Sequence, residues 1–120
     1  MGTWNSGPFD NHTAAELLAA LRDGTFDFEA FKKSCTDDYI DVDEAETYIA
    51  LGALTKLRAD ELPQGIAPER LSGIYTPQSR AWLRKKINQA LQPEVSGAVA
   101  LWEETGELEQ WVRTARAAQP

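Results

Sequence analysis

The chain has 120 residues, of which 42% are apolar and 26% are charged, and its formal net charge is −7. This composition predicts one soluble globular domain over 1–120. The sequence has no run of about 18 apolar residues, which a membrane-spanning helix needs, and it does not begin with the basic region and apolar run of a signal peptide. The acidic excess argues against nonspecific nucleic-acid binding, which needs a basic surface.

The segment MGTWNSGPFDN at 1–11 carries two large aromatic side chains, Trp4 and Phe9. Aromatic side chains are costly to leave in water, so we expect this segment to be ordered and packed on the domain. Trp4 and Phe9 would anchor it, and Asn11 would satisfy free N–H groups at the start of the next helix. A binding arm is the alternative. The segment also fits a myristoylation pattern, but the bulky Trp4 argues against lipidation.

Apolar residues at helical spacing predict the first two helices. One helix is expected at 13–22, capped by Thr13 or, one turn earlier, by Asp10 or Asn11, and ended by Gly24. A shorter helix follows at about 27–34, with two phenylalanines on one side.

A third helix is expected at about 44–58, where Asp43 and Glu46 have capping-box spacing. Apolar residues cover most of its circumference, which is typical of a central helix. Gly52 lies in its middle and costs up to about 1 kcal/mol relative to Ala. We therefore expect a neighbouring element to pack closely against Gly52.

The segment 60–76 holds two prolines and two glycines, so we expect a long loop with one short helical turn near 69–71. Loops of this length are often functional or mobile. A fourth helix follows, with Thr76 as its N-cap and Pro77 at its first position.

Pro93 is expected to open a fifth helix, which Gly106 breaks or kinks before a last amphipathic helix around 108–115. No alternating pattern typical of strands is present. The sequence predicts an all-α fold, a compact bundle of five to six helices with the ordered N-terminal segment packed on it.

The opening also resembles a known signature, M-G-x-W-x-x-G-x-F-x-N, which Met1, Gly2, Trp4, Gly7, Phe9 and Asn11 match here. The chain is therefore similar to a bacterial family of small proteins, domain-of-unknown-function family 4259, over nearly its whole length, including the ending LWEETGELEQWV. Asn5 departs from the family's Gly, and Asn tolerates the turn better than most residues. The resemblance implies membership and no activity, so no site residue is transferred.

Six carboxylates gather around the connection to the third helix and form our candidate interaction surface: Asp37, Asp38, Asp41, Asp43, Glu44 and Glu46. Carboxylates suit Ca²⁺ or Mg²⁺, but Glu46 stands where a calcium loop starting at Asp41 requires Gly. Helix capping with a solvated acidic face is the favoured interpretation, and a weak cation site is the alternative.

The other reactive side chains predict no catalytic site. No motif joins the only histidine, His12, to the only cysteine, Cys35. A single cysteine fits a reducing cytoplasm and a partly buried thiol.

The single basic cluster could bind phosphate, although pairing with the acidic half of the protein is favoured. It consists of Arg80, Arg84, Lys85 and Lys86. The large aromatic residues fit apolar helix faces and are expected in the core rather than in a ligand pocket. They are Tyr48, Tyr75, Trp82, Trp102 and Trp111.

Residues 1–60 carry 12 acids against 5 bases, whereas residues 61–120 carry 7 of each. This asymmetry predicts a cytoplasmic, non-enzymatic protein–protein interaction module, immunity- or adaptor-like, whose acidic N-terminal half meets a partner with a basic surface. No cofactor is implied, and we expect a monomer or weak dimer. The alternative is a small-molecule-binding protein or an enzyme with a pocket under the 60–76 loop.

Overall fold

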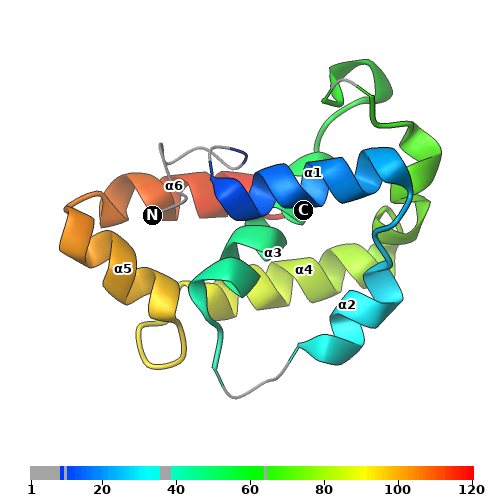
Figure 1. Ribbon diagram of the computed structural model, residues 1–120. Helices are drawn as coiled ribbons and strands as arrows, with labels where there is room; N and C mark the ends of the chain where they lie inside the picture. Colours follow the sequence, from blue (N-terminus) through cyan, green and yellow to red (C-terminus); the bar gives the residue numbers. More distant parts are fainter. Residues whose placement is uncertain (1–8, 10, 36–38, 64) are drawn as a thin grey trace.

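The computed structural model describes residues 9, 11–35, 39–63 and 65–120, which form an all-α bundle (Figure 1). In chain order the elements are α1 (His12–Asp23), α2 (Phe28–Ser34), α3 (Val42–Thr55), the 3₁₀ helices η1 (Ala59–Glu61) and η2 (Pro68–Ile74), α4 (Pro77–Ala90), α5 (Gly97–Thr105) and α6 (Leu108–Ala118). No helix in this described part of the chain is long and apolar enough to cross a membrane. The predicted fold class of five to six helices is confirmed.

Helix α3 is the centre of the core, as its apolar circumference predicts. Ten of its 14 residues are buried, and it contacts α1, α4, α5, α6 and η2. Tyr48, Leu51 and Leu54 are fully buried. The close packing expected at Gly52 is confirmed, because a Cβ there would lie 2.9 Å from Cδ1 of Ile87 and closer still to the carbonyl oxygen of Ala118.

Side-chain caps set where the first three helices begin. Asn11 Oδ1 accepts a 2.7 Å hydrogen bond from the N–H of Ala14, and Asp41 Oδ1 accepts a 2.8 Å bond from the N–H of Glu44. Asn11 is thus the cap of α1, and α3 begins earlier than expected because Asp41 takes the capping role we assigned to Asp43. The Thr13 hydroxyl instead donates to Asp43 Oδ1 at 3.2 Å, which joins α1 to α3.

The expected start of the fifth helix at Pro93 is wrong, because α5 begins at Gly97. Backbone pairing occupies the intervening residues: the N–H of Ile40 donates to Val95 O at 2.7 Å, and the N–H of Gly97 donates to Ile40 O at 2.9 Å. This bridge ties the chain entering α3 to the chain entering α5. Gly106 ends α5 in the left-handed conformation, with φ of 78°, as expected for a helix-terminating glycine.

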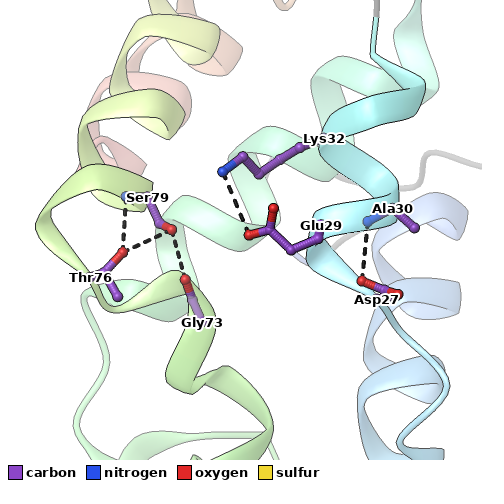
Figure 2. Close-up of polar contacts among 7 residues, drawn as sticks. All are labelled: Asp27, Glu29, Ala30, Lys32, Gly73, Thr76 and Ser79. Carbon is purple, nitrogen blue, oxygen red and sulfur yellow. Dashed lines mark hydrogen bonds and ion pairs between the residues drawn. The ribbon is translucent and has the colours of Figure 1, made fainter.

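The segment 60–76 is more regular than a loop with one turn. The helix η2 spans seven residues and buries Leu71 and Ile74 against the core. It is fastened to α4, where the Ser79 hydroxyl donates to Gly73 O at 2.7 Å and the N–H of Ser79 donates to Thr76 Oγ1 at 3.1 Å (Figure 2). The predicted cap Thr76 is confirmed.

The predicted ordered segment 1–11 falls mostly outside the described residues, and Trp4 is among those not described. Two of its residues are described. Phe9 is half-buried against the core, and Asn11 is buried as the cap of α1.

Candidate functional site

The predicted acidic surface at 37–46 is only partly accessible. Asp37 and Asp38 lie outside the described residues. Glu46 is 5% exposed, so assigning it to an interaction surface was wrong. The reason is the central position of α3, because neighbouring helices cover part of its first turns.

The remaining carboxylates of this group contribute to the fold. Asp41 caps α3, Asp43 accepts from Thr13, and Glu44 Oε2 accepts a 2.7 Å hydrogen bond from the Tyr48 hydroxyl. Across the described ranges, no three His, Cys, Asp or Glu side chains are grouped to hold a metal ion. Helix capping therefore accounts for Asp41, although the sequence assigned the capping role to Asp43.

A cleft of about 530 Å³ lies between the α1–α2 connection and η2, which is part of the segment 60–76. Its apolar lining is formed by Leu21, Phe26, Phe28, Leu51, Leu71 and Ile74. The lining also contains three charged residues, Asp27 and Glu29 from α2 and its cap, and Arg70 from η2. Polar and apolar atoms contribute comparably to the exposed lining, so the cleft has a mixed surface rather than the mostly apolar one of a typical small-molecule pocket.

The two carboxylates of the cleft differ in availability. Asp27 Oδ1 accepts a 3.1 Å hydrogen bond from the N–H of Ala30 and so caps α2. Glu29 and Lys32 project from α2 toward α4 (Figure 2), with Glu29 Oε1 at 3.8 Å from Lys32 Nζ and the Glu29 side chain 72% exposed. So long and exposed an ion pair contributes little to stability, which leaves the Glu29 carboxylate open to a second partner.

The third charged residue, Arg70, closes one side of the cleft. A Cβ at Gly24 would lie 2.6 Å from Nη1 of Arg70, so the guanidinium packs directly on this glycine. Gly24 ends α1 with φ of 74°. A cation beside a helix C-terminus is stabilised by the helix dipole, which gives Arg70 a structural role here as well.

The predicted basic cluster does not form one patch. Lys86 is 3% exposed and lies 5.8 Å from the centre of the Trp82 ring, which Lys32 approaches at 5.7 Å. Arg84 Nε donates to Pro120 O at 3.0 Å, and Arg80 lies 6.0 Å from the ring of Tyr75. Three of the four basic residues, Arg80, Arg84 and Lys86, therefore contact aromatic rings or a backbone carbonyl within the protein.

The predicted core aromatics are confirmed for Tyr48, Trp102 and Trp111, which are all buried. Trp82 and Tyr75 are half-buried and pack against the core. Trp82 makes edge contacts with Phe28 and Tyr48 at ring separations of 5.7 and 5.5 Å, a preferred aromatic geometry.

Cys35 lies beside this aromatic cluster and is half-buried, in agreement with the sequence. Its Sγ donates to Phe31 O at 3.2 Å. Burial raises the pKa of the Cys35 thiol, although a hydrogen bond with the Tyr48 hydroxyl opposes the increase. Burial also raises the pKa of Tyr48. His12, in contrast, pairs with Glu16 at 2.8 Å on the exposed side of α1, so the two reactive side chains have separate surroundings.

We expect iodoacetamide to alkylate Cys35 with a pH midpoint above that of a free cysteine, because the thiolate is the nucleophile and burial disfavours it. Mass spectrometry of the alkylated fraction against pH measures this midpoint. The urea-unfolded chain serves as control and should titrate like free cysteine; a folded midpoint at or below that control would contradict the prediction.

The sequence predicted a pocket under 60–76 only as part of the alternative function. It did not single out Asp27, Glu29 or Arg70, which are ordinary surface residues in the sequence. The sequence does indicate a role for Asp27 as a helix cap, since an acidic residue one position before a helix is a typical N-cap. Nothing local indicates that Arg70 packs on Gly24 at the end of α1, because the two are brought together by the packing of η2 on α1.

Comparisons with known proteins give one match. No curated protein and no solved structure matches this chain. A family described as a domain of unknown function, DUF4259, matches residues 2–114. This match covers almost the whole chain and agrees with the resemblance in its opening motif, so the protein belongs to the DUF4259 family.

Proposed function

We propose that this protein is a non-enzymatic protein–protein interaction module, immunity- or adaptor-like, that acts in the cytoplasm on a partner with a basic surface. The observation that supports it is the cleft between α2 and η2, where an apolar floor meets the carboxylates of Asp27 and Glu29. A lysine or arginine of a partner can lay its aliphatic stem on such a floor and keep its charge at the rim. The net charge of −7 favours the approach of such a partner.

Glu29 is the residue best suited to bind the partner's charge. Its carboxylate is exposed and its only described ion pair, to Lys32, is long. Exchanging that pair for a partner's cation costs little, since exposed pairs contribute only about 0–1 kcal/mol. Asp27, which caps α2, would add negative potential without leaving its helix.

A second candidate function, small-molecule binding, is favoured by the size of the cleft. Its volume of about 530 Å³ falls within the range of about 300–1,000 Å³ typical of small-molecule pockets. Arg70 could contact an anionic group of such a ligand. An enzyme would use this same cleft.

Titration of isotope-labelled protein with a short lysine- and arginine-containing peptide tests the first proposal. We expect amide shifts concentrated at Thr25–Glu29 and at Gly73, which line the cleft. Glu29→Lys should weaken binding about tenfold, since it replaces attraction with repulsion. The matched control Glu16→Lys changes the net charge equally on the exposed side of α1, and it should retain binding within about twofold.

Two outcomes would count against the interaction module. The first is that the basic peptide leaves the cleft amides unshifted. The second is that Glu29→Lys and Glu16→Lys weaken binding equally, which would indicate attraction by net charge alone. If small organic anions shift the cleft amides while the peptide does not, the small-molecule alternative is favoured.

A further inference from the structure

A second concentration of negative charge surrounds α5. Residues 87–112 contain five glutamates and no lysine, arginine or histidine. The equal totals of acids and bases in the second half of the chain conceal this local imbalance. All five side chains are on exposed residues: Glu94, Glu103, Glu104, Glu107 and Glu109.

These carboxylates are not neutralised within the described chain. Ion pairs form there at Glu16, Glu29, Asp60 and Glu61, and none of these reaches the glutamates around α5. The contrast with the first half is clear, because Asp41 and Glu44 are held by hydrogen bonds to the fold. The negative potential at α5 therefore faces solvent.

Helix stability does not explain the position of Glu103 and Glu104. Both lie near the C-terminal end of α5, and no basic residue occupies its last turn. Carboxylates at a helix C-terminus oppose the helix dipole and are unfavourable there. Unlike Asp27 and Asp41, which cap α2 and α3, these two cost stability, which favours a role outside the fold.

A groove of about 340 Å³ lies beside the same carboxylates. It is lined by Pro93, Val99, Ala100, Glu103 and Glu104. Its apolar wall and acidic edge are displayed on a firm support, because Trp102 of α5 stacks on Trp111 of α6 with ring centres 6.2 Å apart. A surface held in place in this way loses little freedom on binding.

We infer that this groove and its carboxylates form a second docking surface, which takes a basic amphipathic segment of a protein partner. An apolar side chain of that segment enters the groove against Val99 and Ala100, and its lysines or arginines meet Glu103 and Glu104. A single metal ion is a poor alternative, because the carboxylates are not grouped as metal ligands among the described residues. Charge complementarity and the apolar wall together select a segment with both kinds of side chain.

This surface is separate from the cleft of the proposed function and does not depend on it. Helices α5 and α2 lie at opposite ends of the bundle (Figure 1), whose longest dimension is 37 Å. One partner could contact each end at the same time, which is the arrangement that an adaptor needs.

The probe is a short amphipathic peptide of leucine and lysine, with binding measured by calorimetry at low and physiological salt. The double variant Glu103→Gln/Glu104→Gln should bind about tenfold more weakly, with a smaller salt dependence. The matched control Asp23→Asn/Glu69→Gln removes the same charge from other exposed positions, and it should stay within about twofold. Unfolding midpoints of both variants at or above the parent's establish that each is folded.

Ala100→Lys supplies an independent variant, because Ala100 is exposed and lines the groove. It should also weaken binding about tenfold by filling the groove and adding a like charge. Equal loss in the Glu103/Glu104 and Asp23/Glu69 double variants would overturn the inference. Loss only in Glu29→Lys would overturn it while leaving the cleft proposal intact. Spermine binding as tightly as the peptide would also overturn it, since the apolar wall would then contribute nothing.

Discussion

Trp111→Ala is expected to lower the free energy of unfolding by about 3–5 kcal/mol, as deletion of a large buried aromatic side chain does. Trp111 is 3% exposed and stacks on Trp102 with an angle of 14° between the rings. Truncation removes apolar area and leaves a cavity between α5 and α6, which the two helices cannot fill without shifting. The loss would be a large share of the total stability of a small domain, about 5–15 kcal/mol.

Denaturant unfolding followed by circular dichroism measures this loss. The adjacent Gln110 is exposed on the same helix, so Gln110→Ala should change stability by no more than about 0.5 kcal/mol. The prediction is wrong if Trp111→Ala and Gln110→Ala unfold at the same denaturant concentration.

Gly52→Ala is expected to destabilise the protein by about 1–3 kcal/mol, the usual cost of overpacking a core. Alanine has the higher helix propensity, by up to about 1 kcal/mol, so propensity alone predicts the opposite sign. The added Cβ would lie 2.9 Å from Cδ1 of Ile87 and against the carbonyl oxygen of Ala118. Ile87 can change rotamer, whereas the backbone oxygen can move only with the end of α6.

Gly73→Ala is the matched control for this variant. A Cβ at Gly73 meets nothing within 4 Å, so this substitution should be neutral or stabilising by up to about 1 kcal/mol. Comparison of the two midpoints separates packing from backbone entropy. A Gly52→Ala protein more stable than the parent would contradict the prediction, because it would mean that the end of α6 moves away from the added Cβ without loss of stability.

Local chemistry in the sequence determined the class of fold and most helix ends. Gly24 and Gly106 end helices because each accepts the left-handed conformation that other residues avoid. Thr76 and Pro77 start α4 for equally local reasons. The side-chain oxygen of Thr76 accepts a hydrogen bond from a free N–H group, and the ring of Pro77 fixes a helical φ. The central position of α3 could also be predicted, since an all-round apolar helix must be covered on every side.

Contacts between distant segments decided what the local pattern could not. Pro93 is a good first residue for a helix, yet residues 93–95 form a turn, and the bridge between Ile40 and Ser96 delays the start of α5 until Gly97. Glu46 looks like a surface acid in the sequence, yet packing around α3 buries it. Ile40 is tens of residues away from Ser96, and the helices that pack on α3 are distant in sequence from it, so no window of neighbouring sequence contains the information.

The candidate binding surfaces divide in the same way. The sequence by itself determined the acidic charge, the helical architecture and the presence of glutamates without bases around α5. Only the tertiary structure decided which acids are engaged in the fold and which face solvent, and it alone brought Arg70 beside Gly24 to form the cleft. The physical reason is that charge and helix propensity belong to single residues and their near neighbours, whereas burial and cavity shape arise where separate helices pack together.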